Sequence, residues 1–234
     1  FGLESLVADE MRRLDLKNVR AENGRVHCDG TLADIARLNI SLRCGARVLM
    51  ELGSFPARDF EALFQGVYAL PWEDYISRDG EFPVKGYSLN SQLHSVPACQ
   101  SIVKKASAKR LGEKYGVETL PESGSRYQIQ FSIIKDVATL YLDTSGEGLY
   151  KRGYRAKNMG APLRETLAAA LVTLSRYRGK DPFCDPFCGS GTIPIEAALI
   201  AKNRAPGLDR SFAAQKWKNM DSKLWLEAAD QAMG

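Results

Sequence analysis

Apolar residues recur every three or four positions in three segments near the start of the chain, residues 3–14, 31–42 and 57–68. This period is that of an amphipathic helix, so we predict a helix over each segment. Asn23-Gly24 lies between two short runs and predicts a hairpin. Residues 47–52 are predicted to form a short strand. Helices beside a small sheet of short strands indicate an α+β unit.

The middle of the chain combines one long helix with strands. Residues 82–89 are predicted to form a strand, and a helix begins near Pro97, because proline favours the first helical turn. Apolar and polar residues alternate over residues 127–133, and this period of two predicts a half-buried strand. A second strand is predicted over residues 137–142.

The last part of the chain has the pattern of an α/β domain. Ala161-Pro162 begins a predicted helix that runs to Leu174. Residues 181–187 are compact and apolar, a Gly-Ser-Gly-Thr turn follows, and residues 193–200 are apolar at helical spacing. This order predicts a buried strand, a glycine-rich turn and a helix. A final helix is predicted around Trp225.

The glycine-rich turn is the strongest candidate for a ligand site. Its two glycines let backbone approach a ligand closely, and the first N–H groups of the following helix are unpaired. Such a turn is typical of nucleotide-like ligands. A P-loop would need a lysine after Gly191, a dinucleotide fingerprint would need a small residue where Pro194 stands, and a hydrolase elbow would need glycine in place of Cys188. The alternative is a tight structural turn without a ligand.

An acidic residue stands directly before this turn, at Asp185, and the segment then resembles motif I of class I methyltransferases that use S-adenosylmethionine. The form of the motif, with Ile-Glu-Ala-Ala downstream, is similar to that of RNA guanine-N2 methyltransferases with a THUMP domain. The resemblance implies that the whole motif contacts S-adenosylmethionine. Its residues are Asp185, Pro186, Phe187, Cys188, Gly189, Ser190, Gly191 and Thr192.

A second segment extends the resemblance to most of the chain. Residues 143–155 (Asp-Thr-Ser-Gly-Glu-Gly-Leu-Tyr-Lys-Arg-Gly-Tyr-Arg) resemble the join between THUMP and catalytic domains in rRNA guanine-N2 methyltransferases. The resemblance implies an α+β module, ferredoxin-like plus THUMP, followed by the opening βα portion of a Rossmann-like α/β methyltransferase domain. We place the ferredoxin-like subdomain at residues 1–55, the THUMP domain at 56–155 and an incomplete methyltransferase domain at 156–234.

The helix before the glycine turn resembles the family segment called motif X, which lies against the methionine end of the cofactor. This resemblance makes Arg155, Pro162 and Glu165 candidate pocket residues. The alternative for each is a role in the linker or on the helix surface. Glu196, the one charge in an apolar run, is equally consistent with a hydrogen bond to the turn and with a cofactor contact.

Positive charge is concentrated in two places, although the net charge of the chain is only +4. Residues 97–116 hold five basic residues against Glu113 alone, and residues 151–164 hold five basic residues and no acid. Such clusters indicate an anionic partner, of which RNA is the commonest; the alternative is a solvated helix face and a basic linker. The candidate RNA-binding residues are Lys104, Lys105, Lys109, Arg110, Lys151 and Arg152.

Composition excludes several other classes. The 234 residues are 44% hydrophobic and 26% charged, as in soluble globular proteins, and no apolar run is long enough to span a bilayer. Five cysteines without a CxxC pair indicate reduced thiols in a cytoplasmic protein. We expect Cys184 and Cys188 to be packed apolar thiols rather than a metal clip. His27 and His94 lack the partners of a zinc site, so no metal is predicted.

The family resembled also has an Asn/Asp-Pro-Pro-Tyr/Phe motif that holds the target guanine, and residues 1–234 contain none. We therefore expect a fragment whose catalytic residues lie beyond Gly234, and which alone binds RNA weakly without methylating it. The favoured target is 23S rRNA, with a tRNA guanine-N2 methyltransferase as the close variant. A noncatalytic RNA-binding protein stays open as the alternative, and Pro194 disfavours a nicotinamide-dependent dehydrogenase.

Overall fold

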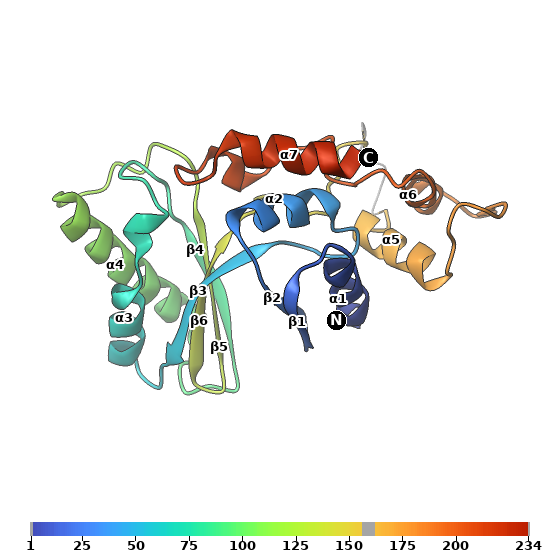
Figure 1. Ribbon diagram of the computed structural model, residues 1–234. Coiled ribbons are helices and arrows are strands. Elements are labelled where there is room, and N and C mark those ends of the chain that lie inside the picture. Colours follow the sequence, from blue (N-terminus) through green and yellow to red (C-terminus); the bar gives the residue numbers. More distant parts are fainter. Residues whose placement is uncertain (1, 156–161, 234) are drawn as a thin grey trace. The chain divides into compact units, whose positions relative to one another are not determined.

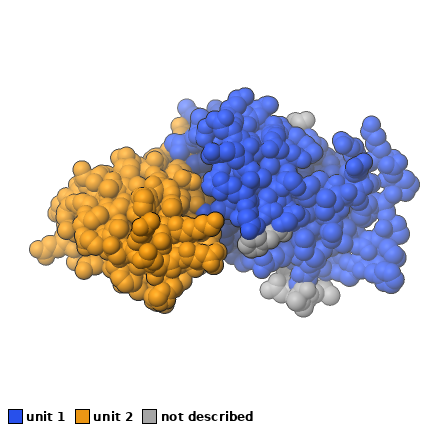
Figure 2. Space-filling model, turned by 90° about the horizontal axis from the view of Figure 1, so that it is seen from below, with its two compact units in different colours: residues 1–48, 147–212, 222–234 blue, residues 49–146, 213–221 orange. Residues whose placement is uncertain are grey.

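The computed structural model describes residues 2–155 and 162–233, and these form two compact units. Unit 1 combines residues 1–48, 147–212 and 222–234, and unit 2 combines residues 49–146 and 213–221 (Figure 2). Phe1, residues 156–161 and Gly234 lie outside the described residues. Unit 1 therefore combines residues from both ends of the chain.

Unit 2 is built on a four-stranded mixed sheet in the order β3-β6-β5-β4 (Figure 1). Its strands are β3 (Leu49–Pro56), β4 (Val84–Leu89), β5 (Gln128–Ile134) and β6 (Val137–Asp143). The pairs β3–β6 and β5–β6 are antiparallel, and β4 runs parallel to β5 with Val84 opposite Ile129. Lys135 and Asp136 both adopt positive φ angles, which closes the tight β5–β6 turn.

Two helices lie side by side along this sheet, α3 (Phe60–Ala69) and α4 (Val96–Tyr115) (Figure 1). The Asp59 carboxylate accepts the Ala62 N–H and caps α3, and Gly116 ends α4 in the left-handed conformation at φ 64°. Short 3₁₀ turns follow at Trp72–Asp74 and, late in the chain, at Ala213–Lys216. The buried Trp72 indole N–H donates to the Val67 carbonyl.

The polar residues of β5 differ from the prediction of a half-buried strand. Gln128 and Ser132 are only 8% and 2% exposed, so two of the three polar residues in the alternating set are buried. The Gln128 amide donates to the carbonyls of Pro83 at 2.8 Å and Ile129 at 3.1 Å. Alternating polarity identifies a strand, but it does not distinguish a solvated polar side chain from a buried one whose hydrogen bonds are satisfied.

Unit 1 begins with α1 (Glu4–Arg13), the hairpin β1 (Lys17–Glu22) with β2 (Arg25–Asp29), and α2 (Leu32–Ser41). The predicted hairpin at Asn23-Gly24 and the predicted helix within residues 31–42 are confirmed. Thr31 accepts the Asp34 N–H while the Asp34 carboxylate accepts the Thr31 N–H, which is a complete capping box.

The rest of unit 1 contributes three helices, α5 (Glu165–Leu174), α6 (Thr192–Ala201) and α7 (Ser222–Met233). In Figure 1, α7 lies along α2, and α5 lies beside α6. Cys44, Ala169 and Ala170 form a buried cluster that Leu3, Leu6 and Val7 of the α1 region cover. The first helix of the chain is therefore packed against α5, far away in sequence.

The segment before the glycine turn contradicts the sequence prediction. We expected a buried strand over residues 181–187, but these residues form no strand and most of them are exposed. Phe187 is 93% exposed. A parallel strand needs neighbours that accept and donate its backbone hydrogen bonds. Within the described residues neither sheet includes this segment.

Candidate functional site

The glycine turn has the backbone conformation that its sequence requires. Gly189 and Gly191 adopt φ angles of 54° and 78°, a region that side chains other than glycine rarely occupy. The Gly191 N–H donates to the Cys188 carbonyl at 2.8 Å and closes the turn. Helix α6 then begins at Thr192, with Gly191 as its cap residue. The turn thus leads directly into the amino end of α6.

The amides of this turn are available to a ligand. In the part of the chain that the structure describes, the N–H groups of Gly189 and Ser190 donate to no protein acceptor. A Cβ placed on Gly189 would meet no atom within 4 Å, so the space over this residue is open. Unpaired amides at a helix amino end attract an anionic group such as a carboxylate.

Asp185 lies on the exposed approach to the turn. Its carboxylate accepts the Phe187 N–H at 3.1 Å, a local bond that fixes the side chain beside the backbone. Cys184 and Cys188 are both exposed free thiols, so the expectation that they pack as apolar residues is wrong. Without a strand before the turn, no core is present there to enclose them.

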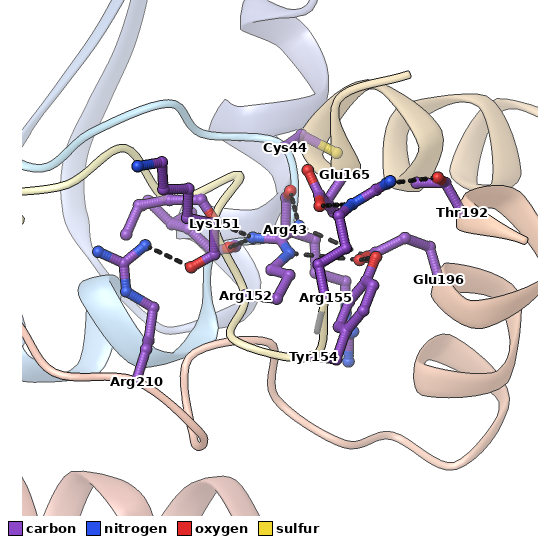
Figure 3. Close-up of polar contacts among 12 residues, drawn as sticks. Arg43, Cys44, Lys151, Arg152, Tyr154, Arg155, Glu165, Thr192, Glu196 and Arg210 are labelled. Atoms are coloured by element: carbon purple, nitrogen blue, oxygen red, sulfur yellow. Dashed lines mark hydrogen bonds and ion pairs between the residues drawn. The ribbon is translucent and has the colours of Figure 1, made fainter. Parts of the chain in front are cut away.

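Arg155 brings together residues that are distant in sequence (Figure 3). Its Nε donates to Glu165 Oε1 at 2.7 Å, and its Nη2 donates to Thr192 Oγ1 at 2.5 Å. Nη1 reaches Ser190 Oγ at 3.3 Å. The join, the start of α5 and the glycine turn therefore meet at one guanidinium, and four predicted cofactor residues share one hydrogen-bond network.

Pro162 lines a cavity of about 740 Å³ beside this network, together with Arg155 and Glu165. Helix α5 begins at Glu165, with Arg164 as its cap residue, so Pro162 precedes the helix that it was predicted to start. The cavity is also lined by Lys151 and Arg152, two predicted RNA-binding residues. None of the eight motif residues from Asp185 to Thr192 lines it.

A buried ion pair that the sequence analysis missed lies behind the site. The Arg152 and Glu196 side chains are 2% and 0% exposed, and Arg152 Nε lies 3.3 Å from Glu196 Oε1. Arg152 also donates to the carbonyls of Leu149 at 2.8 Å and Arg43 at 2.6 Å (Figure 3). Because α6 contains Glu196, the pair attaches the helix of the glycine turn to the chain after α2. The prediction that Arg152 binds RNA is therefore wrong, because a buried side chain cannot reach a phosphate.

Tyr154 completes this network. Its hydroxyl donates to Glu196 Oε1 at 3.0 Å, and burial together with the adjacent Glu196 carboxylate raises the pKa of the phenol. Tyr154 therefore stays a neutral donor. The signal in the sequence was Glu196, a single charge in an apolar helix, because a buried carboxylate needs a positive partner.

Arg210 fixes the join from the other side. Its guanidinium donates to the carbonyls of Glu147 at 2.8 Å, Gly148 at 2.6 Å and Lys151 at 2.9 Å. Because one arginine side chain donates to three backbone carbonyls, it holds these residues of the join together. Nothing in the local sequence marks Arg210, because its acceptors are carbonyl groups far away in the chain.

The predicted RNA-binding residues on α4 have varied surroundings. Lys104 pairs with Glu122 at 2.8 Å, and the Arg110 guanidinium pairs with both carboxylate oxygens of Glu73. Lys109 lies over the rings of Phe64 and Tyr68, 5.8 and 5.5 Å from their centres. Lys105 is exposed. On the join, Lys151 pairs with Glu147 at 2.6 Å and stays half exposed.

Within the described residues there is neither a metal-binding cluster nor a membrane-spanning helix. No group of three or more His, Cys, Asp or Glu side chains within them is arranged to hold a metal ion. None of their helices combines the length and the apolar content that crossing a membrane requires.

Comparison with protein families identifies three consecutive domains. Residues 1–49 match the RlmL ferredoxin-like domain, residues 57–143 match the THUMP domain, and residues 152–233 match the RMKL-like methyltransferase domain. The matches account for nearly the whole chain and follow the order that the sequence predicts.

Two curated relatives resemble the chain over its full extent. The protein named "Putative RNA methyltransferase YpsC" from Bacillus subtilis is 45% identical over 97% of this chain and 60% of its own length. "Ribosomal RNA large subunit methyltransferase K/L" of Psychromonas ingrahamii is 35% identical over 100% of this chain and 32% of that protein. The chain thus spans less than two thirds of either relative.

Two solved structures share the fold closely. SMU.472, solved in complex with SAH, superposes with a TM-score of 0.93 at 44% identity. The match covers 99% of this chain and 61% of the SMU.472 chain. A Listeria monocytogenes protein described as a "predicted N6-adenine-specific DNA methylase" superposes with a TM-score of 0.95 at 49% identity, over 99% of this chain and 61% of its own.

Proposed function

Because the chain combines the RlmL ferredoxin-like, THUMP and RMKL-like methyltransferase domains, we propose that the protein methylates RNA with S-adenosylmethionine. The observation on which the proposal rests is the glycine turn, which has free amides and open space at Gly189 and leads directly into α6. The favoured target is the N2 amine of a guanine in 23S rRNA.

The residues present fit the cofactor. The Asp185 carboxylate suits a cationic amino or sulfonium group, and the amides of Gly189 and Ser190 suit a carboxylate. Arg155 holds the turn through Ser190 and Thr192 while Glu165 orients the guanidinium. When bound, S-adenosylmethionine supplies a methyl group for transfer to a nucleophile. The protein's task is to hold that methyl group in line with the amine.

RNA is the proposed partner because the chain contains a THUMP domain and because its positive charge is unevenly placed. Unit 1 has 20 Lys and Arg against 15 Asp and Glu, whereas unit 2 has 12 against 13. Phosphate contacts from basic side chains provide most of the affinity for a nucleic acid. A ribosomal RNA substrate also fits the cytoplasmic location that the sequence predicts.

The first test is cofactor binding by the complete gene product. We expect Asp185→Ala to weaken binding of S-adenosylmethionine or SAH by about 10- to 100-fold, because a hydrogen bond to a charged group contributes about 1.5–3 kcal/mol. Asp181→Ala, in the same exposed loop, is the matched control and leaves binding unchanged. Isothermal titration calorimetry measures both. Equal effects of the two substitutions would show that Asp185 does not contact the cofactor.

The second test identifies the acceptor. Labelled S-adenosylmethionine is incubated with undermodified 23S rRNA, tRNA and genomic DNA, and we expect label in 23S rRNA at guanine N2. Label in tRNA alone would favour the tRNA variant, and label at adenine in DNA would support the description given to the Listeria protein. No label in any of them, with an Asn/Asp-Pro-Pro-Tyr/Phe motif missing from the complete gene, would favour a noncatalytic RNA-binding protein.

A further inference from the structure

Unit 1 contains a second, larger cavity of about 1050 Å³ that the cofactor site does not use. It is formed by α1, the end of α2 and the residues after it, the carboxyl ends of α5 and α6, and α7. Among the described residues, five arginines from these separate parts of the sequence line it, whereas Asp9 and Glu10 are the only acidic residues that do so. The five are Arg13, Arg37, Arg43, Arg176 and Arg178.

Both acids of the cavity are already engaged. Asp9 pairs with Arg12 at 2.8 Å, outside the lining. Glu10 Oε2 accepts the backbone N–H groups of Arg43 at 3.0 Å and Cys44 at 3.3 Å, and burial raises the pKa of its carboxyl against the opposing effect of these N–H groups and of the Arg43 charge. Neither carboxylate forms an ion pair with an arginine side chain that lines the cavity.

Most of these arginine side chains form no ion pair with another described residue. Arg37 pairs with Asp34, but among the described residues Arg13, Arg176 and Arg178 have no ion pair or hydrogen-bond acceptor for their guanidinium groups. Arg43 Nη1 is buried without a hydrogen-bond partner, which is costly for a charged group. Several unpaired guanidinium groups around one cavity indicate an anion with more than one charge.

The remaining walls suit a nucleotide better than an isolated inorganic ion. Leu14, Leu174 and Ile200 provide apolar surface, and the half-buried Tyr177 ring packs edge-on against Phe183 with 5.0 Å between ring centres. Single-stranded nucleic acids bind through arginine contacts to phosphate combined with aromatic and apolar contacts to bases. The cavity provides both kinds of surface.

We propose that this arginine-lined cavity binds phosphate groups of a single-stranded part of the RNA substrate, an inference that rests on the proposed function. It lies at the carboxyl end of α6, whereas the glycine turn lies at the amino end, and ten residues of helix separate them by about 15 Å. A contact at that distance holds flanking RNA and does not touch the base that is methylated. The cavity therefore positions the substrate from the opposite end of the same helix.

RNA affinity as a function of salt tests this inference in the purified protein. With a fluorescent single-stranded RNA, we expect Arg176→Ala/Arg178→Ala to weaken binding about 10-fold or more and to lower the slope of log Kd against log salt by about 1.4, since each lost phosphate contact lowers it by about 0.7. Lys17→Ala/Arg20→Ala, on exposed β1, removes the same charge elsewhere in unit 1 and leaves the slope unchanged. Arg176→Lys/Arg178→Lys keeps the charge and retains most of the slope.

The outcomes separate this inference from the function on which it rests. If the unaltered protein binds no RNA, both fail. If it binds RNA and the two alanine pairs weaken binding equally, only general charge acts and the cavity proposal is overturned. Binding of guanosine monophosphate that the Arg176→Ala/Arg178→Ala pair abolishes, with RNA affinity unchanged, would assign the cavity to a free nucleotide and also overturn it. Unchanged far-ultraviolet circular dichroism shows that each variant is folded.

Discussion

The two basic clusters of this chain look alike in sequence and differ in the folded protein. Each has five Lys or Arg within a short segment, residues 97–116 on α4 and residues 151–164 at the join. On α4, the half-buried Arg110 pairs with Glu73 and both side chains keep 19% exposure. At the join, Arg152 is 2% exposed and its partner Glu196 is fully buried. Lys157 lies outside the described residues.

A run of positive charge therefore does not by itself identify a nucleic-acid surface. At the join, Arg152 and Arg155 hold α6 and the glycine turn in place through Glu196, Glu165 and Thr192. In unit 2 the acids balance the basic residues, whereas unit 1 retains an excess of positive charge. The uncommitted arginines of unit 1 lie around a cavity that neither cluster indicated.

The largest expected effect comes from separating the buried pair. Arg152→Ala leaves the Glu196 carboxylate buried without its ion-pair partner, and we expect the free energy of unfolding of unit 1 to fall by about 3–5 kcal/mol. Urea denaturation followed by hydrogen exchange of α6 peptides measures this loss. Lys151→Ala, the exposed neighbour, is the control and leaves the urea midpoint unchanged. A stable Arg152→Ala protein with protected α6 amides would contradict the structural role assigned to this pair.

An intermediate effect is expected for the half-buried Arg110–Glu73 pair of unit 2, and this effect depends on pH. The hydrogen bonds from Arg110 lower the pKa of the Glu73 carboxyl below its ordinary value of 4.5. A lowered folded-state pKa stabilises the protein above the unfolded-state value, and this contribution is lost as pH falls through the folded-state pKa. We expect Glu73→Gln to cost about 1 kcal/mol at neutral pH after screening by solvent, and nothing in acid.

Thermal unfolding of the wild type and Glu73→Gln over a pH series measures this difference. Glu61→Gln, a carboxyl on the first turn of α3 without an arginine partner among the described residues, is the control and shows no comparable pH dependence. A gap between wild type and Glu73→Gln that is the same at every pH would mean that packing, and not the ion pair, causes the loss.

The smallest effect is expected at Lys105, which is exposed on α4. Lys105→Ala should change the free energy of unfolding by less than about 0.5 kcal/mol, because surface substitutions away from special contacts rarely do more. If α4 faces RNA, the same substitution weakens RNA binding and lowers the salt slope by about 0.7. Fluorescence anisotropy titration at two salt concentrations distinguishes this from an unchanged slope, which would remove α4 from the RNA-binding surface.

Local patterns of the sequence were enough for much of the fold. Helical spacing predicted α1, α2 and α6, the capping residues of α2 stand at Thr31 and Asp34, and Asn23-Gly24 marked the hairpin. These features are determined by neighbours a few residues apart, through backbone hydrogen bonds and turn geometry. The glycine turn was predictable for the same reason, since positive φ angles at Gly189 and Gly191 need no distant contact.

Other features depended on partners that no local pattern names. Whether residues 181–187 form a strand depends on neighbouring strands, and whether Gln128 is exposed depends on acceptors at Pro83 and Ile129. Sequence patterns were sufficient to predict the helices, the hairpin, the glycine turn and the family motifs. The folded structure was needed to show that Arg152 is buried against Glu196, that Arg155 joins Glu165 to Thr192, and that arginines from distant segments line one cavity. This is because ion pairs and burial depend on contacts between residues that are far apart in sequence. The sequence around a charged residue does not show whether water or a buried carboxylate will surround its side chain.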